Sequence, residues 1–125
     1  MRRYDVDKNR LLDAVRGLLD EGFRYPVLHT AVDHGEGVEL VYLFRALGPP
    51  GESEVMLAVR LDDDDLRVSS LTPLVPGFNF QEREVYDLFG VFYEGHPDLR
   101  RLLLPDGFQG HPLRKRYTLW DGDIQ

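Results

Sequence analysis

Apolar residues near the start of the chain recur with the spacing of one helix face: Leu11, Leu12, Val15, Leu18 and Leu19. Positions separated by three, four and seven residues lie on the same side of an α-helix. Asp5 or Asp7 can supply the N-cap, and Gly22 is a typical residue at the C-terminal end of a helix. The pattern predicts an amphipathic helix over residues 11–19.

Three stretches after this helix have the composition and alternation of β-strands. Tyr25 to Asp33 is rich in β-forming residues, and Val38 to Leu47 has apolar residues on both alternating faces, which is typical of a strand inside a sheet. Val55 to Leu61 alternates in a similar way and follows a glycine- and proline-rich turn over Gly48 to Ser53. We therefore expect the last two strands to pair antiparallel, with the helix over residues 11–19 covering one face of the sheet.

A second helix is predicted over Phe80 to Phe89, where Gly90 ends the pattern. Beyond Gly90 the chain has no sustained period and is punctuated by glycine, proline and histidine. An irregular stretch of about 35 residues is uncommon inside a compact domain, and such segments are often functional or ordered by a partner. We expect an irregular C-terminal tail that serves as a docking surface.

These elements predict one α+β domain over residues 1–125, with a small antiparallel sheet packed with an N-terminal helix, then a second helix and an irregular basic tail. The first helix and the sheet occupy residues 1–75, and the second helix and the docking tail occupy residues 76–125. The composition agrees with one globular domain, since 42% of the 125 residues are apolar and 30% are charged. The longest apolar run, Leu40 to Phe44, is far shorter than the roughly 20 residues of a membrane-spanning helix, so we expect no direct membrane span.

Composition excludes several classes of function. The chain has no cysteine, which rules out thiolate catalysis, zinc knuckles and cysteine-ligated iron–sulfur clusters on this chain. The net charge of −7 argues against a nucleic-acid partner, because phosphate contacts require a basic surface. What remains is a cofactorless domain whose function depends on its contacts.

The tail has a local excess of positive charge despite the acidic total. Its basic residues are Arg100, Arg101, Arg114, Lys115 and Arg116. An irregular segment cannot bury much apolar surface by itself, and arginine holds carboxylates and carbonyls in a fixed geometry. We expect this tail to dock a partner protein. The alternative is that the arginines form internal ion pairs with Glu82 or Glu84 and only hold the tail in place.

The predicted helix over residues 80–89 holds three carboxylates, which makes it the first place to look for acid/base chemistry. On a helix Glu82 and Glu84 point about 160° apart, so they cannot act on one substrate. Arg83 and Asp87 are four residues apart and can form a surface ion pair. We expect Glu84 and Asp87 on the outward face, where they can join the docking surface.

Glu82 falls on the apolar side of this helix, which is costly for a carboxylate without a partner. Two interpretations remain open. In the first, Asn79 is the N-cap and Glu82 either completes a capping box or pairs with an internal arginine. In the second, Glu82 transfers protons, since carboxylates with a perturbed pKa are enriched in functional sites.

Two histidines stand in similar Gly-His-Pro stretches, His96 and His111. With Asp98 or Asp106 they could be imagined as metal ligands, but their spacing matches no compact metal motif. The proline after each histidine restricts the local backbone, so a hydrogen bond that locks the loop is the simpler interpretation. We expect the chain to bind no metal.

From Glu82 to Val91 and from Phe92 to Leu103 the sequence resembles the 30-kDa subunit family of respiratory complex I, the NADH:quinone oxidoreductase. The family's E-R-E-x-x-D-L-F-G core is followed here by its G-H-P-D-L-R stretch and, from Gly110 to Lys115, by its G-H-P-L-R-K stretch. Leu71 to Leu74 and Pro76-Gly77 extend the resemblance, which covers about half of the chain.

The resemblance implies a peripheral-arm subunit that binds no cofactor and has no catalytic site of its own, in a complex that uses NADH and quinone. Its partners would be the large quinone-site (49-kDa-like) subunit and other peripheral-arm subunits, at the cytoplasmic side of the cell membrane. The residues implied in the motif or the partner interface are Glu82, Arg83, Glu84, Asp87, His96, Arg100, Arg101, His111, Arg114 and Lys115.

Alternatives remain open. The same domain occurs in energy-converting membrane-bound hydrogenases and formate hydrogenlyase-type complexes, and this chain is shorter than the usual family member. It also has Arg116 where the family usually has an acidic residue. Outside this class, a hydrolase that uses Glu82 or His96 and a scaffold outside any redox complex are the other hypotheses.

Overall fold

Helices and strands follow one another closely along residues 2–48, 53–100, 110–111 and 113–114, which a computed structural model of the chain describes. In chain order they are β1 (Arg2–Asp5), η1 (Lys8–Arg10), α1 (Leu11–Asp20), β2 (Tyr25–Asp33), β3 (Val38–Ala46), β4 (Ser53–Leu61), β5 (Arg67–Ser69), η2 (Pro76–Phe78), α2 (Asn79–Phe89) and β6 (Phe92–Glu94). The two helical and three long-strand predictions are confirmed to within two residues at each end.

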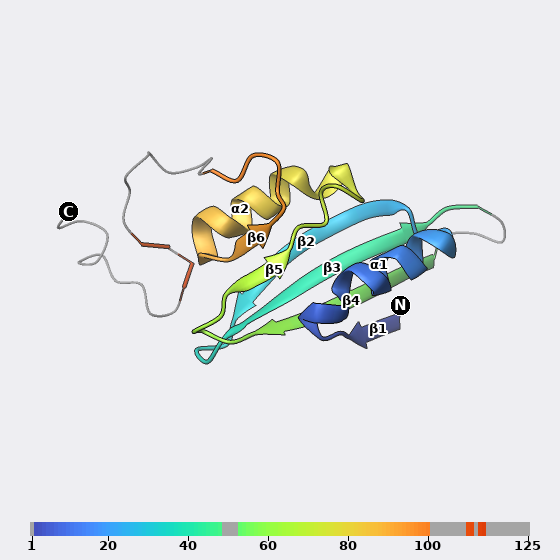
Figure 1. The fold of residues 1–125 in the computed structure, drawn as a ribbon. Coiled ribbons are helices and arrows are strands. Elements are labelled where there is room, and N and C mark those ends of the chain that lie inside the picture. The colour runs from blue at the N-terminus through green and yellow to red at the C-terminus, as the bar shows by residue number, and fades with distance from the viewer. Residues whose placement is uncertain (1, 49–52, 101–109, 112, 115–125) are drawn as a thin grey trace.

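Four strands form a mixed sheet in the order β1-β4-β3-β2 (Figure 1). β3 pairs antiparallel with β2 and with β4, and the β3–β4 register runs from Val38 opposite Leu61 to Ala46 opposite Ser53. This confirms the predicted antiparallel hairpin. The expectation of a purely antiparallel sheet is wrong, because β1 pairs parallel with β4. The four residues of β1 are all exposed, so no apolar alternation marks it as a strand.

One face of this sheet carries the core. Alternate residues of β3 on this face are fully buried: Val38, Leu40, Tyr42 and Phe44. α1 turns Leu11, Val15 and Leu18 toward the core and lies over the sheet, running along the strands (Figure 1). The predicted placement of the first helix over one sheet face is confirmed.

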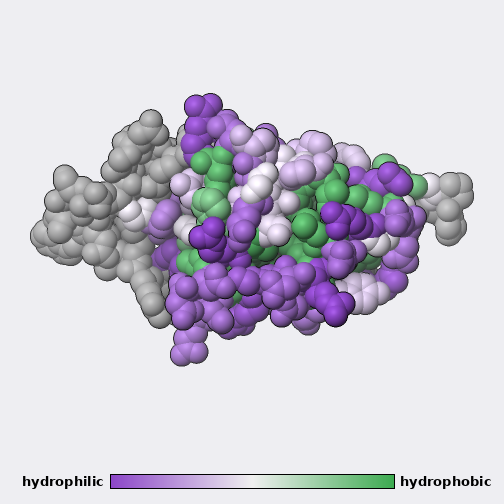
Figure 2. Space-filling model, viewed as in Figure 1, coloured by the Kyte–Doolittle hydropathy of each residue, from purple (hydrophilic) through white to green (hydrophobic). Residues whose placement is uncertain are grey.

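A second layer of elements completes the same side. β5 and β6 form a two-stranded parallel sheet, and α2 packs along β2 (Figure 1). Hydrophilic residues cover much of this side of the molecule, and its hydrophobic surface forms separate patches (Figure 2). β6 lies in the stretch predicted to be irregular, and that prediction is wrong for residues 92–94. Three residues form a strand here because β5 is available to pair with them.

Neither helix of the described ranges is long and apolar enough to span a membrane. α1 has 10 residues and α2 has 11, whereas a bilayer core requires about 20.

Candidate functional site

The Glu82 carboxylate is the centre of a buried hydrogen-bond network between α2 and the loop after β5. Its Oε1 accepts the hydroxyl protons of Ser70 and Thr72 at 2.6 and 2.7 Å, and its Oε2 accepts the Leu71 N–H at 2.7 Å. The residue has no solvent exposure. Hydrogen bonds to an ionised acceptor are about twice as strong as neutral ones, so three donors compensate for much of the cost of burying the charge.

The capping-box interpretation of Glu82 is wrong. A 3₁₀ turn over Pro76–Phe78 runs directly into α2, so Asn79 is already helical and makes no capping hydrogen bond with its side chain. Glu82 instead points across to the loop at residues 70–72. An arginine partner is also absent among the described residues, where the donors to Glu82 are two hydroxyls and one backbone N–H.

His96 lies beside this carboxylate and locks the loop that follows β6. Its Nδ1 accepts the Asp98 N–H at 2.9 Å, which confirms the predicted loop-locking hydrogen bond and leaves the proton of a neutral ring on Nε2. Nε2 lies 3.9 Å from Glu82 Oε1, too far for a hydrogen bond, and has no other hydrogen-bond partner among the described residues. The imidazole side chain is fully enclosed, so His96 belongs to the interior.

A second buried histidine joins the sheet to β6. His29 Nδ1 donates to the Val41 carbonyl at 3.0 Å, and its Nε2 accepts the Tyr93 hydroxyl at 2.6 Å. The ring stacks on Tyr42 with a centroid separation of 4.1 Å. Burial lowers the pKa of His29 to about 4, because the charged imidazolium loses its hydration, although the hydrogen bond to Val41 partly opposes this shift.

The second Gly-His-Pro stretch caps the C-terminal end of α2. His111 Nδ1 donates to the Asp87 carbonyl at 2.9 Å, and the Leu113 N–H donates to the Leu88 carbonyl at 3.0 Å. These carbonyls have no partner within their own helix. Gly90 allows the close approach, because a Cβ there would lie only 2.9 Å from the His111 ring. The described part of the tail therefore completes α2.

Arg114 joins this cap to the end of β2 and to the loop after β4. Its Nε donates to Asp33 Oδ2 at 2.6 Å, and a second nitrogen forms a hydrogen-bonded ion pair with Asp63. Burial by itself would lower the pKa of Arg114, but the hydrogen bonds and charges of the two carboxylates outweigh it and raise the pKa. Arg114 does form internal ion pairs, but the predicted partners Glu82 and Glu84 are wrong, because Asp33 and Asp63 take that place.

The remaining predicted residues differ in their environments. Asp87 is fully buried, and the expectation that it lies on the outward face is wrong. The predicted Arg83–Asp87 ion pair is not formed, and the buried Nε of Arg83 has no hydrogen-bond partner among the described residues. Glu84 is half-buried. Arg100 is exposed and pairs with Asp98 at 3.3 Å, whereas Arg101 and Lys115 lie outside the described residues.

Taken together, these groups form a closed structural centre. Glu82, His96 and His29 are enclosed, so a solute cannot reach their polar atoms without a change in the fold. Within the described ranges, no group of three or more metal-ligating side chains is close enough to hold an ion. The geometry supports positioning of the tail and of the loop over residues 95–100, and it does not support proton transfer to a substrate.

Comparison with known proteins identifies the fold and the motif. Residues 4–122 match the family described as "Respiratory-chain NADH dehydrogenase, 30 Kd subunit". The chain belongs to this family.

Members of the 30-kDa subunit family are similar to this chain over most of its length. An NADH-quinone oxidoreductase subunit of Moorella thermoacetica is 47% identical over 115 residues, which are 91% of this chain and 78% of that protein. An NAD(P)H-quinone oxidoreductase subunit of a Synechococcus species is 46% identical, over 81% of this chain and 61% of that protein. The chain therefore spans roughly three fifths to four fifths of these two relatives.

Two solved structures share the fold of the 30-kDa subunit family. A trypsin-resistant fragment of Nqo5 superposes with a TM-score of 0.71 at 30% identity, over 78% of this chain and 81% of that one. A chain of an archaeal respiratory complex, the membrane-bound sulfane sulfur reductase, superposes with a TM-score of 0.83 at 25% identity, over 95% of this chain and 74% of that one. The predicted α+β class is confirmed.

The family motif residues find partners that sequence reasoning missed. Ser70 and Thr72 bind Glu82, and Asp33 and Asp63 bind Arg114. The run of aspartates at residues 62–65 is the sequence feature that could have indicated a partner for Arg114, because a concentrated acidic loop favours a basic partner. No local pattern links residues 70–72 to a helix that begins seven residues later.

Arg114→Ala is expected to destabilise the isolated chain by about 2 kcal/mol, because Asp33 and Asp63 lose a shared, largely buried partner. The free energy of unfolding can be measured by urea denaturation. Arg100→Ala is the control, since the exposed Arg100–Asp98 pair contributes less than about 1 kcal/mol. Equal stability of the two variants would contradict the structural role of Arg114.

Proposed function

We propose that this chain is a non-catalytic, cofactorless peripheral-arm subunit of a complex I-type NADH:quinone oxidoreductase. The observation that carries the proposal is the family match over residues 4–122. The closed centre supports it, because the ionisable groups of α2 and its loops stabilise the fold and are not open to a substrate. NADH and quinone are then bound by other subunits, and this chain lies peripherally at the cytoplasmic side of the membrane.

We further propose that the chain docks on the large quinone-site subunit through the exposed loop that carries Arg100. His96 is buried and hydrogen-bonded to Asp98, so it holds the loop from which Arg100 projects into solvent. Because the backbone of this loop is held in place, Arg100 loses little conformational freedom when a partner carboxylate binds it. Arg114 binds Asp33 and Asp63 within the chain, so we assign it to holding the tail against the sheet.

Purification of the tagged chain from its native cells in mild detergent tests the function. We expect the large quinone-site subunit and other peripheral-arm subunits in the same complex, together with a flavin-binding, NADH-oxidising subunit. Recovery of the chain alone would contradict the proposal. Turnover of a substrate by the chain alone would favour a hydrolase instead.

Arg100→Glu is expected to weaken association with the large subunit by roughly 2 to 5 kcal/mol, because it places two like charges in the interface. The melting temperature of the isolated chain should stay within about 1 °C of the wild type, because Arg100 is exposed. Arg16→Glu is the matched control, since Arg16 is also more than half exposed and pairs with a nearby aspartate. Equal recovery of the large subunit with both variants would count against this docking surface.

A second candidate is the equivalent subunit of a membrane-bound complex of another kind, such as an energy-converting hydrogenase. The superposition on the archaeal sulfane sulfur reductase complex favours it, because that match covers 95% of this chain. Co-purification distinguishes the two candidates. A large subunit that retains four nickel-binding cysteines would support a hydrogenase, whereas a flavin-binding, NADH-oxidising partner would support the first candidate.

A further inference from the structure

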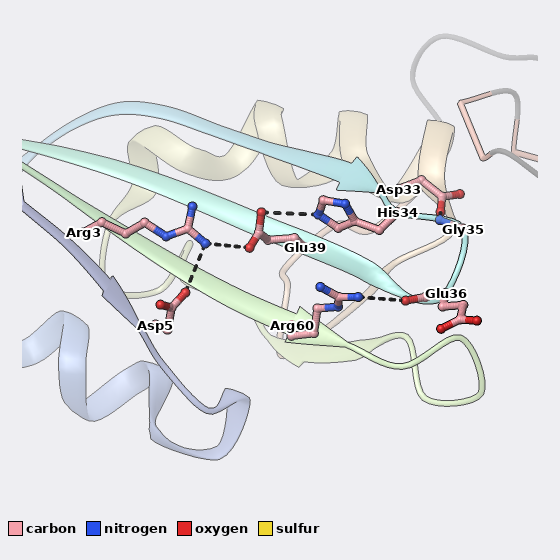
Figure 3. A network of polar contacts seen from close by, with 8 residues as sticks. All are labelled: Arg3, Asp5, Asp33, His34, Gly35, Glu36, Glu39 and Arg60. Atoms are coloured by element: carbon pink, nitrogen blue, oxygen red, sulfur yellow. Dashed lines mark hydrogen bonds and ion pairs between the residues drawn. The ribbon is translucent and has the colours of Figure 1, made fainter.

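One face of the four-stranded sheet is open. In the described ranges, both helices and the β5–β6 pair lie on the opposite face (Figure 1), and Figure 3 looks onto the open one. The open faces of antiparallel sheets are normally polar. Here apolar side chains line up across three strands, because the register places Leu28 opposite Leu43 and Leu43 opposite Met56.

The apolar residues form a band along β2 and β3 with one member, Met56, on the neighbouring β4. We call it the open-face stripe: Tyr25, Leu28, Val32, Val41, Leu43 and Met56. Its members on β2 are substantially exposed, at 53% for Tyr25, 41% for Leu28 and 42% for Val32. Contiguous exposed apolar surface of this kind is uncommon on a chain that functions alone and usually marks an interaction site.

The charges beside the open-face stripe are satisfied within the chain. Arg3 reaches over β4 to Glu39 at 2.7 Å, as Figure 3 shows. At the other end of the stripe, Arg45 and Glu54 form an ion pair at 2.6 Å. Arg60, on the same face of β4, donates to the Glu36 carbonyl at 3.1 Å (Figure 3). A partner therefore meets charged groups that already have hydrogen bonds at the borders and an uncharged centre, so the surface that covers the centre is itself apolar and uncharged.

The width and length of the open-face stripe match those of a single α-helix. Two strands span about 10 Å, and the seven steps from Tyr25 to Val32 span roughly 23 Å. A single α-helix is about 10 Å in diameter and advances about 1.5 Å per residue, so about 15 helical residues cover the stripe. A second four-stranded sheet would be about twice as wide and would collide with the side chains of Arg3 and Glu39.

Pairing of a partner strand with the edge of β2 is disfavoured. The His29 N–H on this edge already donates to Gln81 Oε1 at 2.8 Å, and Pro26 has no N–H to offer. Contact with β2 must therefore come from its open face.

We infer that the open-face stripe is a docking site for one amphipathic helix of another subunit, presenting an apolar face without charges. The inference rests on the proposed function, because it requires that the chain works inside a complex. It adds a second contact, on the side of the sheet opposite to α2 and the tail.

The test uses the full chain, tagged and purified in mild detergent from its native cells. Leu28→Lys with Val32→Lys places two charges in the open-face stripe at exposed positions that the fold tolerates. We expect at least a tenfold lower recovery of one partner subunit, with a melting temperature within about 2 °C of the wild type. Tyr4→Lys is the matched control, because Tyr4 is 45% exposed on β1 and points to the opposite side of the sheet. It should recover the full set.

Cross-linking of the assembled complex identifies the occupant without disturbing the fold. A photoreactive residue in place of Thr30, which lies between Leu28 and Val32 and opposite Val41, should attach to a helix of another subunit. Cross-links to a second copy of this chain or to a loop, or unchanged recovery with the double lysine variant, would overturn the inference and leave the proposed function standing. If the wild-type chain recovers no partner at all, the proposed function fails first and the inference fails with it.

Discussion

Glu82→Gln is expected to lower the free energy of unfolding by about 4 kcal/mol, a large part of the roughly 5–15 kcal/mol that holds a domain of this size. The amide has nearly the shape of the carboxylate, but it has one acceptor oxygen and carries protons on its nitrogen. At least one of the three donors from residues 70–72 then faces another donor inside the protein. Each lost hydrogen bond to a charged group is worth about 1.5–3 kcal/mol.

Urea denaturation of the isolated chain measures this effect, and Glu84→Gln is the control. Glu84 lies on the same helix and is only half-buried, so its substitution should change stability by less than about 0.5 kcal/mol. Should Glu82→Gln fail to fold, Ser70→Ala and Thr72→Val remove single donors and are expected to cost about 1–2 kcal/mol each. Similar stabilities of the Glu82 and Glu84 variants would contradict the network.

Acidification is expected to remove about 3 kcal/mol of stability through His29 between pH 7 and pH 4. The pKa of its imidazole is about 4 in the folded chain and 6.5 when unperturbed. Between these pH values the His29 imidazole binds a proton in the unfolded chain but not in the folded chain. The stability from His29 is therefore complete above pH 6.5 and is lost as the pH falls through the window, at up to 1.4 kcal/mol per pH unit.

Comparison with variants separates His29 from the carboxylates that also titrate. His29→Gln should flatten the dependence of unfolding free energy on pH between pH 6.5 and 4.5, whereas His34→Gln should leave it as in the wild type, because His34 is exposed. The pKa can also be read directly from the imidazole NMR signals of the wild-type chain. A His29 signal that titrates near pH 6.5 would refute the effect of burial.

The elements predicted correctly are those whose signal is local. α1 and the β3–β4 hairpin have apolar residues at the spacing of their own secondary structure, so a short window of sequence specifies them. Gly90 ends α2 with a φ of +83°, a conformation that glycine adopts without strain. These features depend on neighbours along the chain, and their predicted bounds agree with the structure within two residues.

The incorrect predictions concern features that depend on residues far apart in the sequence. β1 and β6 are short strands, and each exists because a strand distant in the sequence pairs with it. The outward placement of Asp87 is wrong because helical periodicity describes one contact face, whereas α2 is covered on more than one side. The His111 ring and Leu113 N–H reach its final carbonyls from residues more than 20 positions away.

The candidate site, too, was predicted only where its features depend on residues close in the sequence. Composition and periodicity were sufficient to predict an α+β fold on a chain without cysteine, and to place Glu82 on the inward side of its helix. Only the tertiary structure decided which groups donate hydrogen bonds to that carboxylate, because folding brings the loop at residues 70–72 against α2. Folding also brings Arg114 to Asp33. The physical reason is range: backbone propensity and side-chain periodicity act over a few residues. The cost of a buried charge, by contrast, is settled by whichever donors the tertiary packing brings within about 3 Å.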